Sequence, residues 1–120
     1  MSIEIETKLG QIDIADEVIA TIAGDVASSQ VGVVGMTSKK YIRDSFTDLL
    51  KKENNSKGVV VSRNDKGYVV DVYVVVTYGV KISEVARNIQ ENIKYNLAKQ
   101  LNIQAEEINV YIQDVRLMID

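Results

Sequence analysis

The fold is decided by the stretch at residues 59–78, which reads VVVSRNDKGYVVDVYVVVTY. Its middle, residues 64–67, holds Asn, Asp and Gly, which tolerate the positive φ angles of tight turns. A hairpin of strands 59–63 and 68–78 is therefore expected. The second strand carries valines at alternate positions on one face and is mainly apolar on the other face too. Since a strand that is apolar on both faces is typical of the centre of a sheet, residues 68–78 predict the central strand.

Downstream of this hairpin the sequence predicts one long helix and one more strand. Apolar residues recur at helical spacing over residues 83–101, and Asn102 suits the left-handed residue that often follows a helix. Residues 108–113 then alternate as a strand. Strand–helix–strand crossovers are parallel and right-handed in nearly all cases, so 108–113 is expected parallel to 68–78. The helix is expected to pack on the face that carries Val70, Val72, Val74 and Val76.

Upstream, residues 3–14 alternate apolar and polar side chains around an interruption at Gly10, which predicts an N-terminal strand. Apolar residues at helical spacing predict helices at about 17–28 and 39–52, the first with Asp16 as its N-cap. Gly24 lies inside the first helix, where it costs about 1 kcal/mol relative to Ala. A close packing contact is therefore expected at that position.

These elements predict one α+β domain over residues 1–120. The expected architecture is a small mixed β-sheet, made of the hairpin 59–63/68–78, strand 108–113 and the N-terminal strand, packed by amphipathic helices at about 17–28, 39–52 and 83–101. The packing follows because each amphipathic helix needs an apolar sheet face to bury its own apolar stripe.

Composition excludes several classes of chemistry. The 120 residues contain no His and no Cys, so Ser-His-Asp triads, thiolate nucleophiles and Cys/His zinc sites are excluded. No GxxxxGK loop occurs, and no acid pair lies in a recognisable cleft, so we expect no enzyme, no catalytic residue, no cofactor, no metal and no small-molecule substrate. No stretch approaches 18 apolar residues and the N-terminus lacks signal-peptide features, so direct membrane insertion is not expected.

A candidate interaction surface follows from the face of the central strand that points away from the 83–101 helix. We expect exposed apolar side chains there, at Val60, Val69, Tyr73, Val75 and Tyr111. A contiguous apolar patch of this kind usually marks a contact with another molecule. The alternative is that the 39–52 helix or the N-terminal strand covers this face within one chain.

Charge is distributed unevenly along the chain, whose formal net charge is −3. Residues 1–30 hold six acidic residues against Lys8, whereas residues 39–66 hold eight basic residues against four acidic ones. A second, charge-mediated contact is thus expected to use Lys39, Lys40, Arg43, Lys51 and Lys52. Contacts between different surfaces propagate head to tail, so we expect reversible oligomers that high salt weakens, with solvated charged faces as the simpler interpretation.

A nucleic-acid-binding module is the alternative function. Gly32-Val33-Val34-Gly35 matches the GxxG loop with which KH domains clamp a nucleic-acid backbone, and it lies between two predicted helices with Lys39 and Lys40 close behind. Both variable positions of this loop are Val, where a phosphate clamp benefits from a base. The net negative charge also disfavours nucleic acid as a partner.

The chain resembles the alkaline shock protein family of Gram-positive bacteria. The resemblance rests on ordered motifs that span about residues 9–116: GQIDI at 10–14, VIATIA at 18–23, VGVVGM at 31–36, YGVKISEVA at 78–86 with Ile89-Gln90, and INVYI at 108–112. Residues 36–57, with Ile42-Arg43-Asp44 and Lys52-Glu53-Asn54, are similar to the short YloU-like subgroup.

This resemblance implies a cytoplasmic, non-enzymatic protein of the envelope stress response. It implies assembly with itself or with family relatives, and association with the membrane through an integral-membrane partner protein. No catalytic residue carries over, because the family motifs are structural. The sequence ends at Asp120 without the long charged tail of some stress-induced members, so a housekeeping role in envelope or lipid homeostasis is an equal expectation.

Overall fold

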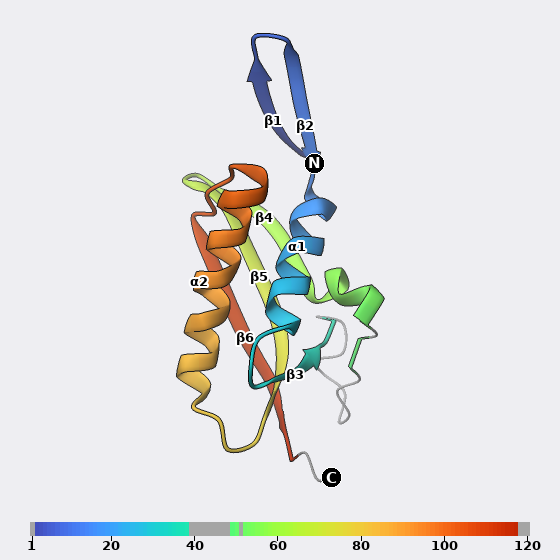
Figure 1. Cartoon of the computed structure of the whole chain (residues 1–120), viewed down its shortest axis with the longest axis vertical. Coiled ribbons are helices and arrows are strands. Elements are labelled where there is room, and N and C mark those ends of the chain that lie inside the picture. Colours follow the sequence, from blue (N-terminus) through green and yellow to red (C-terminus); the bar gives the residue numbers. More distant parts are fainter. Residues whose placement is uncertain (1, 39–48, 51, 118–120) are drawn as a thin grey trace.

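The computed structural model describes residues 2–38, 49–50 and 52–117, which form two β-sheets and two α-helices. Figure 1 shows a two-stranded hairpin projecting from one end of an elongated body in which both helices lie over the same sheet. The molecule measures 55 × 27 × 26 Å along its principal axes. The predicted α+β class is confirmed.

The central strand is β5 (Gly67–Thr77), which pairs with three other strands. It pairs with β4 (Val59–Asn64) through the predicted tight turn and with β3 (Val33–Met36), both antiparallel. It also pairs with β6 (Glu107–Arg116), which runs parallel to β5 as the crossover rule predicted. The position and direction of these strands confirm the predicted centre of the sheet.

Both helices cover one face of this sheet and form the core with it. They are α1 (Asp16–Ser28) and α2 (Ile82–Leu101), and α2 ends in Asn102 at φ 54°, the predicted left-handed residue. Val70, Val72, Val74 and Val76 are fully buried in one cluster with apolar side chains of both helices. The predicted helix-bearing face is therefore the observed one.

Gly24 in α1 makes the close contact that its position suggested. A β-carbon added there would lie 2.8 Å from the backbone oxygen of Asn55, in the 3-10 helix η2 (Lys52–Gly58). The glycine thus lets α1 approach η2 more closely than any side chain allows. Asn55 is itself buried and donates a hydrogen bond of 2.8 Å to the Ser28 hydroxyl.

The N-terminal segment differs from the expectation of one strand in the mixed sheet. It folds back on itself as a separate antiparallel hairpin, β1 (Ser2–Thr7) and β2 (Gly10–Ala15). The reversal is possible because Gly10 adopts φ 144°, a conformation that L side chains rarely adopt. Alternation alone does not distinguish one interrupted strand from two paired ones, since both keep the isoleucines on one face.

Two further local predictions are corrected. Residues 33–36, for which the sequence predicted no strand, form strand β3 and supply the fourth strand of the main sheet, which the N-terminal segment does not join. Asp16 is the first residue of α1, whose N-cap is Ala15, and the Asp16 carboxylate is bound to Arg63. The predicted helix at 39–52 lies largely outside the described residues, and Leu49 and Leu50 have irregular backbone.

Candidate functional site

The face of the main sheet opposite α1 and α2 carries the five residues predicted as an interaction surface. Strand pairing aligns Tyr73 with Tyr111, Val60 with Asp71, and Val69 with Ser62. The Tyr73 and Tyr111 rings stack at 4.9 Å between centroids and 14° between planes. Next to them, the Asn109 side-chain amide donates a hydrogen bond of 2.9 Å to the Asp71 carboxylate. The structure thus gathers these residues on one face.

Exposure on this face is uneven, and the expectation that Tyr73 and Val75 are exposed is wrong. Tyr73 is 5% exposed and Val75 is fully buried, whereas Tyr111 is 41% exposed. The Tyr111 ring lies against Tyr73, and Leu49 lies beside Gly35, the residue that pairs with Val75. Side chains from other segments bury Tyr73 and Val75. Alternation along β5 predicts which side chains share a face, but it does not predict which of them another segment covers. The accessible part of the surface consists of Tyr111 with the half-buried Val60 and Val69.

Burial changes the chemistry of Tyr73. Desolvation raises the pKa of its phenol, and the nearby Asp71 and Tyr111 raise it further. The phenol therefore stays neutral at any ordinary pH. The stacked pair presents an aromatic surface with a hydrogen-bonding rim, which suits contact with a protein rather than proton transfer.

The predicted charge-mediated contact falls mainly outside the described residues. This is the case for Lys39, Lys40, Arg43 and Lys51, and Lys52 is described only as the backbone start of η2. Within the described part of residues 39–66, the base Arg63 has defined contacts, and the sequence predicted it only as part of the basic region.

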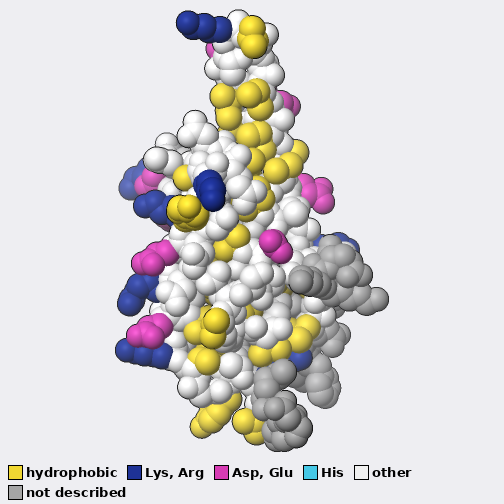
Figure 2. Space-filling view, viewed as in Figure 1, with side chains coloured by type: hydrophobic (Ala, Val, Ile, Leu, Met, Phe, Trp, Pro, Cys, Tyr) yellow, Lys and Arg dark blue, Asp and Glu magenta, His cyan; other side chains and the backbone are white. Residues whose placement is uncertain are grey.

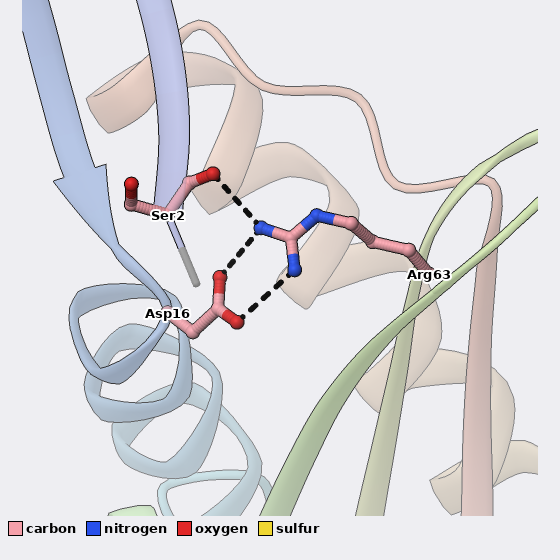
Figure 3. A network of polar contacts seen from close by, with 3 residues as sticks. All are labelled: Ser2, Asp16 and Arg63. Carbon is pink, nitrogen blue, oxygen red and sulfur yellow. Dashed lines mark hydrogen bonds and ion pairs between the residues drawn. The ribbon is translucent and has the colours of Figure 1, made fainter.

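Arg63 holds the projecting hairpin against the body (Figure 3). Its guanidinium donates two hydrogen bonds to the Asp16 carboxylate, at 2.8 and 3.2 Å, and one of 3.1 Å to the backbone oxygen of Ser2. It also lies 4.7 Å from the centre of the Tyr68 ring. The hydrogen bond to Asp16 raises the pKa of the Arg63 guanidinium. No local sequence signal joins these residues, because 47 positions separate Arg63 from Asp16.

The Gly32–Gly35 motif does not form the expected loop between helices. Gly32 turns the chain at φ 94°, and Val33, Val34 and Gly35 already belong to strand β3. Paired with β5, this backbone has no loop geometry for clamping a phosphate. Its predicted neighbours Lys39 and Lys40 lie outside the described residues.

The described residues form an open groove but no cluster of metal-ligating side chains. Within residues 2–38, 49–50 and 52–117, no group of three or more Asp or Glu side chains is placed to hold a metal ion. In the same part of the chain, no helix combines the length and apolar character needed to cross a bilayer. An open groove of about 350 Å³ between α1, η2 and α2 is lined largely by polar side chains, among them Asn55, Asn96 and Gln100.

Comparison with known proteins gives a consistent family assignment. Residues 4–117 match the model of the alkaline shock protein family, which is described as having a cell envelope-related function. An uncharacterized protein of Streptococcus pyogenes, Spy1614, is 52% identical over 118 residues, and the uncharacterized protein YloU of Bacillus subtilis is 47% identical over 117, with 98% of each chain covered in both cases. The uncharacterized protein YqhY of Bacillus subtilis is 40% identical over 111 residues, covering 92% of this chain and 81% of YqhY. No solved structure matches.

Proposed function

This chain belongs to the alkaline shock protein family, with its cell envelope-related function, and on that premise we propose that it is a non-enzymatic scaffold of the cell envelope. It works in the cytoplasm, in the envelope stress response or in envelope and lipid homeostasis. It associates with itself or with family relatives and reaches the membrane through an integral-membrane partner protein. Its chemistry is protein recognition, and no cofactor or substrate takes part.

The observation that carries this proposal is the asymmetry of the main sheet. Both helices cover one face, where Val70, Val72, Val74 and Val76 are fully buried. The opposite face has no helix among the described residues and presents Tyr111, 41% exposed, with Val60 and Val69 beside it. Aromatic side chains are enriched at protein interfaces, and tyrosine is among the residues that contribute most to binding.

Composition supports the non-enzymatic part of the proposal. A chain without His or Cys lacks the side chains most often used as nucleophile, general base or transition-metal ligand. The two tyrosines that face each other on the sheet are held by stacking, and the phenol of Tyr73 is made less acidic by burial, which raises its pKa. The same residues are well suited to contact with another protein.

The test is crosslinking in living cells. A photoreactive phenylalanine analogue replaces Tyr111 in the full chain, and crosslinked partners are identified by mass spectrometry from membranes and from the soluble fraction. The matched control places the same analogue at Tyr95, which is 60% exposed on the outer side of α2. We expect Tyr111, and not Tyr95, to crosslink to an integral-membrane protein.

Crosslinks at Tyr95 as strong as those at Tyr111 would show that the sheet face is not the recognition surface. Recovery of nucleic acid with the Tyr111 crosslinked material, in place of protein, would support the alternative of a nucleic-acid-binding module. A small-molecule turnover by the purified chain would remove the non-enzymatic part of the proposal.

A further inference from the structure

The apolar face of the N-terminal hairpin begins in the core of the molecule and becomes exposed to solvent toward the tip of the hairpin. Register places Ile3 opposite Ile14 and Ile5 opposite Ile12, so the four side chains share one face. Ile3 at the base is 6% exposed, Ile5 and Ile14 are half-buried, Ile12 is 50% exposed, and Leu9 at the tip is 100% exposed. The projecting hairpin in Figure 1 therefore becomes steadily less covered from base to tip.

This hairpin has a defined orientation. At its tip, the Thr7 hydroxyl donates a hydrogen bond to the Gly10 carbonyl and accepts one from the Leu9 amide, both 3.2 Å long. At its base, Arg63 bonds the Ser2 carbonyl and the Asp16 carboxylate. Two-stranded hairpins with one bare apolar face are marginal in water, so a partner that covers Leu9 and Ile12 stabilises this one.

The other end of the long axis carries a second exposed apolar surface. β5 and β6 are parallel, so both end there, and hydrogen bonds of 2.9 and 2.8 Å tie Thr77 to Gly32 and Tyr78 to Arg116. Around these bonds, Val31 is 92% exposed, Tyr78 72% and Leu117 66%. Figure 2 shows hydrophobic side chains along the hairpin and again at this opposite end, which we call the receiving end.

We propose that the apolar face of the hairpin in one copy docks on the receiving end of a second copy, so that copies join head to tail. The inference deepens the proposed self-association and rests on it. Within one chain the two surfaces do not meet, because they lie at opposite ends of a molecule 55 Å long. Because every copy carries one hairpin and one receiving end, a population of copies contains one receiving end for each hairpin.

Charge supports a second copy over other occupants. The hairpin carries Glu4, Glu6 and Asp13 against Lys8, so anionic lipid and nucleic-acid phosphates repel it. Glu4 also lies directly opposite Asp13, a like-charge pair that weakens the hairpin. At the receiving end, the Lys81 ammonium has its side chain 72% exposed and is 3.7 Å from Glu84, which leaves it accessible to an acidic neighbour.

A contact between two different surfaces does not end at a symmetric dimer. In a docked pair, one copy keeps a free hairpin and the other keeps a free receiving end, so the assembly grows as an open chain, or as a ring where the rotation between copies closes. Tyr111 lies on the sheet face opposite α1 and α2, apart from both contact surfaces, and remains accessible along such a chain for the partner described above.

Sedimentation of the purified full chain tests this arrangement. At high protein concentration and low salt we expect a concentration-dependent series of oligomers. Leu9→Lys, at a fully exposed site, should weaken assembly by about 30-fold, the loss typical of an interface hot spot. Val31→Lys at the receiving end should do the same. The controls Gln11→Lys, on the polar face of the hairpin, and Tyr95→Lys, on the outside of α2, should assemble normally.

Mixing the two defective variants gives the sharpest result. The Leu9→Lys copy keeps an intact receiving end, and the Val31→Lys copy keeps an intact hairpin. At concentrations where neither variant assembles alone, an equal mixture should form dimers and nothing larger. Circular dichroism should show native folding for each variant, since both substituted side chains are exposed.

Two outcomes overturn the inference while leaving the proposed function in place. In the first, oligomers form that are indifferent to both substitutions. In the second, Val31→Lys assembles normally while Leu9→Lys does not, which would mean that the hairpin docks elsewhere. A chain that stays monomeric in every condition overturns both this inference and the proposed self-association, whereas crosslinks from Tyr111 to a membrane partner test the rest of the proposed function separately.

Discussion

The main sheet and the N-terminal hairpin use the same alternation of apolar and polar residues and reach opposite degrees of burial. Along β5, Val70, Val72, Val74 and Val76 are fully buried beneath both helices. Along the hairpin, the apolar face is buried only at Ile3 and is open at Ile12 and Leu9. The difference teaches that alternation sets which side chains share a face, while the neighbouring elements decide whether that face is core or contact surface.

The largest effect is expected in the main sheet. Val72→Asp places a charge inside a cluster of buried side chains that are all apolar. Burial of an unpaired charge costs about 4 kcal/mol or more, a large part of the stability of a small domain. Thermal and urea unfolding monitored by circular dichroism should show loss of the cooperative transition. A melting curve close to that of the parent would show that this face is not the core.

Gly24→Ala should have the next largest effect. Alanine gains about 1 kcal/mol of helix propensity over glycine, but its β-carbon would lie 2.8 Å from a backbone oxygen that has no rotamer to change. Overpacking typically costs about 1–3 kcal/mol, so we expect a net loss of about 1 kcal/mol in urea unfolding. Asp25→Ala, the exposed neighbour in α1, is the control and should be neutral or slightly stabilising. An equal gain in both variants would contradict the close approach of α1 to η2.

Arg63→Met is expected to separate the two regions. It removes the three hydrogen bonds that hold Ser2 and Asp16, while the aliphatic side chain keeps part of the packing on Tyr68. Amide hydrogen exchange should become faster in β1 and β2 and stay unchanged in β5. Lys66→Met, at the exposed turn between β4 and β5, is the control. Uniformly faster exchange through the whole chain would mean that Arg63 supports the body and not the hairpin.

The smallest effect is expected at high pH. Burial raises the pKa of Tyr73 in the folded chain, whereas in the unfolded chain it titrates near 10. Above about pH 10 the unfolded state therefore loses this proton first, and stability falls as the pH rises toward the folded-state pKa. Below that pH the phenol is neutral in both states and adds no pH dependence to the free energy of unfolding. Tyr73→Phe should reduce the decrease in the free energy of unfolding above about pH 10. An unchanged decrease would show that other groups cause it.

The sequence was sufficient for the main sheet because each step rests on a strong local or topological rule. An apolar strand with two apolar faces must be central, and the crossover through α2 fixes β6 as parallel to β5. The left-handed backbone of Asn102 and the close packing at Gly24 were likewise predictable, the first from its position after a helix and the second from its position inside one. The hairpin was not, because Gly10 permits both an interruption and a reversal, and the isoleucine pattern is the same in either case.

The sequence predicted which residues of the candidate surface share a face, but it did not predict which of them are exposed. Strand register brings Tyr73 beside Tyr111 as alternation requires, but Tyr73 and Val75 are buried by cover that their own strand does not encode. The anchoring of the hairpin by Arg63 joins residues 47 positions apart and has no local signature. The four-residue strand β3 was missed since so short an apolar segment shows no periodicity.

The most direct test of the hairpin as a contact surface is amide hydrogen exchange on the unmodified full chain over a wide range of protein concentration. If a second copy covers the hairpin, exchange in β1 and β2 should slow as concentration rises, while exchange in β5 stays constant. High salt should partly reverse that protection, because charge contributes to the contact. Exchange in the hairpin that is the same at every concentration would contradict this role.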